Sequence, residues 1–263
     1  MVKVRLLQVK SDETEATSKR IERVVGELPQ HLAAADFVVL PELWTLHAFN
    51  LKSLEENALT LDDKIFKDLS ALANSANTWL HAGTFPMKHV DGTLTNTAVV
   101  FDSQGTLHCL YSKIHLFGFE DGERKYLSSG NQILVSKTPF GQTGISTCYD
   151  LRFPELYREQ TARGAESFLI SAGWPTIRSD HWKTLLKARA IENQSFVIAT
   201  CGRGLANQIE LAGQSMVINP KGEVLAQANI DDEFIDAEID IELVNKWRKE
   251  FPVLGDIRDL HNL

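Results

Sequence analysis

The stretch Gly144-Ile145-Ser146-Thr147-Cys148-Tyr149-Asp150-Leu151-Arg152-Phe153-Pro154-Glu155 joins a run of apolar and small residues to a turn and the start of a helix. It therefore places the thiol of Cys148 at a strand-to-helix junction, exposed at the end of a sheet. Backbone N–H groups and a helix N-terminus at such a junction can stabilise a thiolate and an oxyanion, so Cys148 is a candidate nucleophile. The alternative is a small buried hydrophobe, which is the commoner role of a lone cysteine.

Strand and helix patterns alternate on both sides of this junction. Apolar runs and alternation with a period of two predict strands at residues 2–9, 36–40, 79–85, 95–101, 106–111, 167–171, 196–200, 213–218, 224–228 and 234–239. Helical spacing predicts helices through residues 21–32 and 65–73 and over residues 153–163, 180–193 and 241–251. Asp12 and Glu15 have the spacing of a capping box in front of the first of these helices.

Hairpin signals at Asp91-Gly92 and Gln104-Gly105 place antiparallel strands among the α/β units. No linker, repeat or low-complexity tract divides the chain. We therefore expect an α/β fold of mixed α+β character, with residues 1–263 as a single domain. Two sheets packed together, each covered on its outside by helices, satisfy this pattern.

The composition argues against several classes of protein. The 263 residues carry a formal net charge of -8, which disfavours nucleic acid and anionic membrane surfaces as partners. The first residues lack the apolar region of a signal peptide, and no apolar run approaches the roughly 20 residues of a membrane span. The three cysteines are widely spaced and form no CxxC pair or ligand cluster, so we expect reduced thiols, no metal site and a cytoplasmic location.

Two further reactive side chains follow predicted strands. Glu42 comes directly after an apolar strand and Pro41, where a partly desolvated carboxylate is suited to act as a general base. Lys113 follows the strand at 106–111, where a rigidly held ammonium can stabilise an oxyanion. Taken singly, each is more often a surface side chain. Together with Cys148 they supply a base, an oxyanion stabiliser and a nucleophile.

These three sites lie in motifs that resemble the signature motifs of the nitrilase superfamily, the carbon–nitrogen hydrolases, in the order of that family. The motifs are Leu40-Pro41-Glu42, Tyr111-Ser112-Lys113-Ile114-His115-Leu116-Phe117 and Cys148-Tyr149-Asp150-Leu151-Arg152-Phe153-Pro154-Glu155. The resemblance extends to residues 188–193, 213–220 and 251–254. It implies a four-layer α-β-β-α sandwich and assembly as a homodimer or larger homo-oligomer.

The resemblance also implies a Glu-Lys-Cys triad of Glu42, Lys113 and Cys148. A second active-site glutamate is expected between the lysine and the cysteine, and Glu120 and Glu123 are both candidates. Glu123 is preferred because its distance to Tyr126-Leu127-Ser128-Ser129-Gly130 resembles the spacing of the family. In the implied reaction Cys148 attacks the carbon of an amide or nitrile and forms a thioester that water hydrolyses, without a metal or organic cofactor.

The pocket walls are predicted less directly. The backbone N–H of Tyr149 is expected to stabilise the oxyanion, and Trp174 to line the pocket. Asp150 and Arg152 are expected to form a structural pair that holds the turn, with substrate contact as the alternative.

The motifs resemble most closely an ω-amidase-like branch that deamidates short amides such as 2-oxoglutaramate. The carboxylate of such a substrate needs a cation, for which Arg178, Arg203 and Lys125 are candidates. The alternatives are an N-carbamoyl amine or amino-acid hydrolase, a nitrilase, an enzyme that transfers the acyl group to an amine, and a catalytically silent interaction protein on the same fold.

Overall fold

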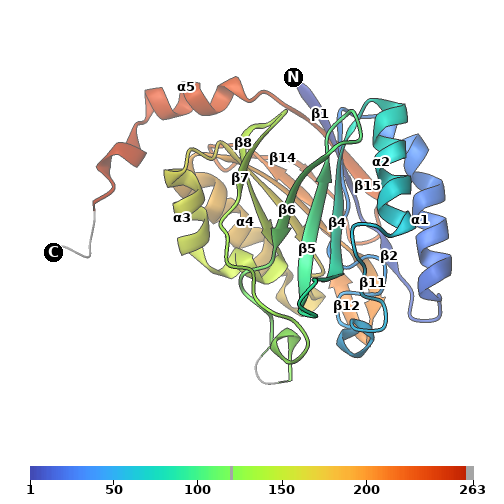
Figure 1. The fold of residues 1–263 in the computed structure, drawn as a ribbon. Helices are drawn as coiled ribbons and strands as arrows, with labels where there is room; N and C mark the ends of the chain where they lie inside the picture. Colours follow the sequence, from blue (N-terminus) through green and yellow to red (C-terminus); the bar gives the residue numbers. More distant parts are fainter. Residues whose placement is uncertain (119–120, 259–263) are drawn as a thin grey trace.

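The computed structural model describes residues 1–118 and 121–258, and two six-stranded sheets form its centre (Figure 1). The first sheet has the order β15 (Phe234–Ile239), β1 (Val2–Leu7), β3 (Phe37–Val39), β4 (Trp79–Lys88), β5 (Leu94–Phe101), β6 (Leu107–Ser112). The second has the order β14 (Val224–Gln227), β13 (Met216–Ile218), β10 (Phe196–Cys201), β9 (Ser167–Ala172), β8 (Gly141–Thr147), β7 (Val135–Thr138). A small sheet joins β12 (Ile209–Ala212), β11 (Arg203–Ala206) and β2 (Lys10–Ser11).

Parallel strands lie in the middle of both large sheets and antiparallel strands flank them. In the first sheet β1, β3 and β4 are parallel, and in the second β8, β9 and β10 are parallel. Since the carboxyl ends of parallel strands meet at one edge of a sheet, the residues that follow β3, β8 and β9 are brought toward a common region.

Three layers of buried side chains separate four layers of structure. One apolar cluster lies between the sheets and includes Leu6, Phe37, Ile145 and Phe196. A second lies under α1 (Thr17–Leu32) and α2 (Lys64–Ala76), and a third under α3 (Pro154–Ala162) and α4 (Ser179–Asn193). Helices therefore cover the outside of both sheets, which is the predicted α-β-β-α sandwich, and α5 (Glu242–Glu250) follows β15 (Figure 1).

The predicted capping box at the first helix is wrong. The helix begins at Thr17, its N-cap is Ala16, and no side chain caps it. The carboxylate of Glu15 instead accepts hydrogen bonds from Arg20 and Arg23. Two arginines one turn into the helix compete successfully for the carboxylate, because charge-assisted hydrogen bonds are stronger than a bond to a backbone N–H.

The sequence did not predict the hairpin of β11 and β12. The strand that it predicts to end at Ile218 is longer than the observed strand. The hairpin turns at Asn207 and Gln208, which both have positive φ without the glycine that marks most such turns. The predicted strand at 213–218 begins only at Met216, because Gly213 and Gln214 have φ of 53° and 51°, which breaks an extended conformation.

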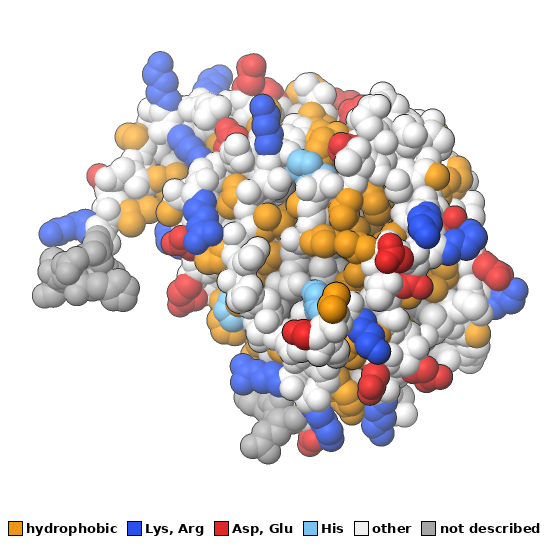
Figure 2. All heavy atoms as spheres, viewed as in Figure 1, with side chains coloured by type: hydrophobic (Ala, Val, Ile, Leu, Met, Phe, Trp, Pro, Cys, Tyr) orange, Lys and Arg blue, Asp and Glu red, His pale blue; other side chains and the backbone are white. Residues whose placement is uncertain are grey.

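The face that β4, β5 and β6 present outward is partly apolar. Figure 2 shows hydrophobic side chains gathered over the middle of this face. A groove there is lined by residues that include Leu61, Met87, Val90 and Leu110. Within residues 1–118 and 121–258, no helix combines the length and the apolar character that crossing a membrane requires.

Candidate active site

The ends of three strands bring Glu42, Lys113 and Cys148 into one cavity between the sheets. Glu42 follows β3, Lys113 follows β6, and Cys148 follows β8. The cavity and the solvent at its opening together occupy about 410 Å³, and all three side chains line it. The sequence prediction that these residues lie together therefore agrees with the geometry, although they are separated by up to 106 positions in the chain (148 − 42).

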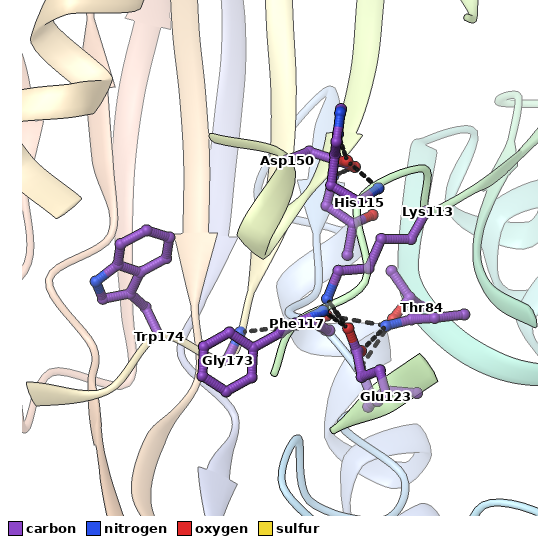
Figure 3. A network of polar contacts seen from close by, with 12 residues as sticks. Thr84, Lys113, His115, Phe117, Glu123, Asp150, Gly173 and Trp174 are labelled. Atoms are coloured by element: carbon purple, nitrogen blue, oxygen red, sulfur yellow. Dashed lines mark hydrogen bonds and ion pairs between the residues drawn. The ribbon is translucent and has the colours of Figure 1, made fainter. Parts of the chain in front are cut away.

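The ammonium of Lys113 is the centre of the cluster, and its side chain is 1% exposed. Its Nζ lies 2.8 Å from Oε1 of Glu42 and 2.8 Å from Oε2 of Glu123. Figure 3 shows the lysine side chain reaching Glu123, with Gly173 and Trp174 on the other side of the site. Burial alone would lower the pKa of Lys113, but the charges of Glu123 and Glu42 outweigh it and raise this pKa well above its ordinary value.

Both oxygens of Glu42 are held by hydrogen bonds. Oε1 accepts from Lys113 Nζ at 2.8 Å and from Asn96 Nδ2 at 2.9 Å, and Oε2 accepts from the backbone N–H of Gly173 at 2.9 Å. The next residue is fixed as well, because the N–H of Leu43 donates to Thr84 Oγ1. A carboxylate with this many donors keeps one orientation relative to Cys148.

Glu123 lies in a short 3₁₀ turn that spans Glu123–Lys125, and it shares both Lys113 and Asn96 with Glu42. Its Oε2 accepts a hydrogen bond of 2.6 Å from the backbone N–H of Phe117. Burial raises the pKa of Glu123, and Lys113 offsets part of this effect. The other candidate for the second glutamate, Glu120, lies outside the described residues.

Cys148 adopts a left-handed backbone conformation, with φ of 47°, at the first position of the 3₁₀ turn Cys148–Arg152. Such a conformation is strained for a residue with a side chain and occurs at sharp turns that present a nucleophile. Burial and then the charge of Glu42 raise the pKa of Cys148 well above its ordinary value. The resting group is therefore a thiol, and burial outweighs the local dipoles that the sequence suggested would favour a thiolate.

The predicted pairing of Asp150 with Arg152 is wrong, although Asp150 does hold the turn as expected. Asp150 is fully buried and accepts from the hydroxyl of Tyr111, from the backbone N–H of Thr147, and from both the backbone N–H and ring of His115. It thus ties the segment of Lys113 to the turn of Cys148, as Figure 3 shows for His115 and Asp150. Arg152 turns the other way, and its guanidinium lies 4.7 Å from the ring centre of Trp174.

The cavity walls contain Tyr149 and Trp174, as predicted, and two arginines, Arg152 and Arg178. Of the three cations proposed for a substrate carboxylate, only Arg178 lies in this cavity. Arg203 is elsewhere, bonded to the backbone of Gln8 and to Glu233, and Lys125 pairs with Asp121 on the surface. The sequence alone did not show which of these cations lines the cavity, because the cavity walls are formed by loops that are far apart in the chain.

Asn96 is the residue of the cluster that the sequence analysis missed. It lies in β5 and is completely buried, and its side-chain amide bonds both Glu42 and Glu123. Asparagine is disfavoured in strands, so an asparagine within the otherwise β-rich run Thr95–Phe101 was an available signal. Within the described residues, no group of three or more His, Cys, Asp or Glu is arranged to hold a metal ion.

The fold and the cluster are those of an α/β enzyme with its site at the strand ends, and comparison with known proteins specifies the class. The family model "Carbon-nitrogen hydrolase" matches residues 3–249, and the chain belongs to that family. It is therefore an enzyme that hydrolyses carbon–nitrogen bonds, and the prediction of the nitrilase superfamily is confirmed.

Individual relatives agree with this assignment. A 2-oxoglutaramate amidase of Paenarthrobacter nicotinovorans is 41% identical over 262 residues, which cover 97% of this chain and 89% of that protein. A 2-oxoglutaramate amidase of Bacillus subtilis (strain 168) is 36% identical, with 92% of each chain covered. The crystal structure of Saccharomyces cerevisiae Nit3, a member of branch 10 of the nitrilase superfamily, has a TM-score of 0.85 at 28% identity and covers 96% of this chain and 94% of its own.

Proposed function

We propose that this enzyme is an ω-amidase-like thiol amidase that releases ammonia from short amides with a carboxylate at the far end, of the 2-oxoglutaramate type. The observation that carries the proposal is one cavity that holds Cys148, Lys113 and Glu42 at its base and Arg152 and Arg178 in its wall. Two relatives that match most of the chain carry the name 2-oxoglutaramate amidase, which supports the same substrate class.

The proposed reaction begins with transfer of the Cys148 thiol proton to Glu42. The sulfur attacks the amide carbon, and Lys113 and the backbone N–H of Tyr149 stabilise the oxyanion. The C–N bond then breaks, and the leaving nitrogen takes the proton from Glu42 and departs as ammonia. Water gives a proton to Glu42 and attacks the thioester, and Cys148 regains its proton as the carboxylate product leaves. Glu123 orients Lys113 and the reacting amide.

The wall of the cavity is suited to an anionic substrate. Among the described residues, neither Arg152 nor Arg178 is within 4.0 Å of a carboxylate oxygen. Burial lowers the pKa of Arg152, and the neighbouring charge of Arg178 lowers it further, so the two cations repel each other. An anion between them relieves this repulsion, and an arginine pairs with a carboxylate through two parallel hydrogen bonds.

The substrate proposal is tested by measuring ammonia release from 2-oxoglutaramate, glutaramate, short neutral amides, N-carbamoyl compounds and nitriles. We expect kcat/KM to be highest for 2-oxoglutaramate and lower for neutral amides of similar length. Turnover of nitriles alone would refute the amidase assignment, and preference for N-carbamoyl compounds would favour the alternative hydrolase. Product that forms only when an amine is added would indicate transfer instead of hydrolysis.

Arg178→Ala is expected to raise KM for 2-oxoglutaramate by roughly 10- to 100-fold, the loss of a hydrogen bond between charged groups. KM for the neutral amide butyramide should change little, because that substrate has no carboxylate to bind. Lys125→Ala is the matched control, since it removes a positive charge on the surface. Equal effects of Arg178→Ala on both substrates would show that Arg178 does not recognise the anion.

We also propose that residues 1–263 act as one domain, because the cluster draws its residues from both large sheets. Assembly as a homodimer or larger homo-oligomer and a cytoplasmic location are carried over from the sequence as part of this proposal.

A further inference from the structure

Asn96 occupies a rigid position in the first sheet. It is a residue of β5, which is paired with β4 on one side and β6 on the other. Its backbone carbonyl accepts a hydrogen bond of 2.8 Å from the N–H of Lys113. It is also paired with Pro86 of β4. The side chain of Asn96 therefore projects toward the cluster from the part of the sheet that also fixes the backbone of Lys113.

The amide nitrogen of Asn96 donates hydrogen bonds to the carboxylates of both Glu42 and Glu123. Nδ2 lies 2.9 Å from Oε1 of Glu42 and 3.3 Å from Oε1 of Glu123. The oxygen of the same amide, Oδ1, is buried and has no hydrogen-bond partner among the described residues. A buried acceptor without a partner costs free energy. The amide keeps this orientation because its nitrogen donates hydrogen bonds to the two carboxylates.

The hydrogen bonds of Glu42 are unequally divided between its oxygens. Each carboxylate oxygen can accept about two hydrogen bonds. Oε1 has two, from Lys113 and Asn96, whereas Oε2 has one, from the backbone of Gly173. The unoccupied acceptor position of Glu42 is therefore on Oε2, and this oxygen is the one free to take a proton from a thiol.

We propose that Asn96 is a positioning residue for the reaction: it occupies Oε1 of Glu42, which directs the thiol proton of Cys148 to Oε2, and it stabilises the charged forms of Glu42 and Glu123 without adding a charge. A second lysine at this position would neutralise the cluster, whereas an amide supplies donors and leaves a carboxylate able to act as a base. The titratable groups that face Asn96 are Glu42 after β3, Glu123 in its 3₁₀ turn and Lys113 after β6. Cys148 lines the same cavity as these three groups. This role rests on the proposed role of Glu42 as the base.

The test compares pH profiles of kcat and kcat/KM for Asn96→Ala, Asn96→Asp and the parent enzyme. Loss of a donor disfavours a charged carboxylate, so in Asn96→Ala the acid limb should move to higher pH by about one unit, and kcat should fall by roughly 10-fold or more. KM should change less than kcat, since Asn96 is not part of the cavity wall. Asn96→Asp keeps the shape but adds a third carboxyl group, and should move the limb further.

The matched control is Thr97→Val. Thr97 is the next residue of β5, is also buried, and points to the opposite face, where its hydroxyl meets those of Thr95 and Ser112. This variant should keep the acid limb of the parent, even where its melting temperature falls.

Three results separate the possible outcomes. If Asn96→Ala and Asn96→Asp lower only the melting temperature and keep the acid limb of the parent, Asn96 has a structural role and the inference is overturned. If the parent hydrolyses no amide, the proposed function fails, whereas an active parent without an acid limb would overturn the inference, because catalysis would then not depend on a charged carboxylate. A larger shift in Asn96→Asp than in Asn96→Ala supports the inference, because space filling alone predicts the reverse order.

Discussion

Replacement of Cys148 with alanine is expected to reduce ammonia release by at least about 10⁴-fold, the scale on which the loss of a nucleophile acts in covalent catalysis. The remaining cluster of Glu42 and Lys113 can still bind an amide, but it has no atom with which to form the thioester. The fold should persist, because the resting thiol is uncharged and makes no ion pair whose loss would leave a buried charge. Alanine also tolerates the left-handed backbone of this position no worse than cysteine does.

Cys109→Ala is the matched control for this variant. Cys109 is a free thiol in β6 that does not line the cavity, and burial raises its pKa to about 12. It should retain parental activity. Mass spectrometry after incubation with substrate should detect an acyl adduct on the parent and on Cys109→Ala, and none on Cys148→Ala. Substantial turnover by a correctly folded Cys148→Ala variant would remove Cys148 from the mechanism.

The sequence predicted the layers of the fold and the meeting of Glu42, Lys113 and Cys148 from related patterns. Buried strands read as apolar runs, and their ends are where polar side chains can meet without disturbing a core. Glu42 and Cys148 follow the buried strands β3 and β8, and Lys113 follows the edge strand β6, so in each case the end of a strand marks the position of the side chain.

The residues that escaped prediction depend on tertiary contacts that no local pattern reports. Asn96 lies inside a strand, and its amide has hydrogen-bond partners only because the segments that carry Glu42 and Glu123 pack against that strand. The closeness of Arg152 and Asp150 in the sequence suggests a pair, but Asp150 accepts hydrogen bonds from Tyr111 of β6 and from His115 in the loop that follows β6. In the same way, the sequence did not show that Arg152 and Arg178 line the cavity and that Arg203 does not, because this depends on how distant loops pack.

Lys113→Met is expected to remove nearly all activity and to destabilise the protein at neutral pH. The ammonium is the proposed oxyanion donor, and the loss of one such donor costs roughly 10²- to 10³-fold in kcat. Methionine fills the volume but leaves Glu42 and Glu123 without the cation between them. Breaking a buried ion pair on one side costs about 3 to 5 kcal/mol of the free energy of unfolding, because an uncompensated charge stays buried.

The pH dependence of this loss distinguishes electrostatics from poor packing. In the parent the pKa of Lys113 lies well above its unfolded value, so its stabilisation is fully present throughout pH 5–8. In Lys113→Met the pKa of Glu123, already raised by burial, loses the opposing effect of Lys113 and rises further. A group with a raised pKa in the folded state stabilises fully below its unfolded pKa, and this contribution is lost as pH rises through the folded pKa. Urea unfolding should therefore show a larger deficit for Lys113→Met at pH 8 than at pH 5, with Lys125→Met near zero at both. An equal deficit at both pH values would mean that methionine fits badly and that the carboxylates do not depend on Lys113 for their charge.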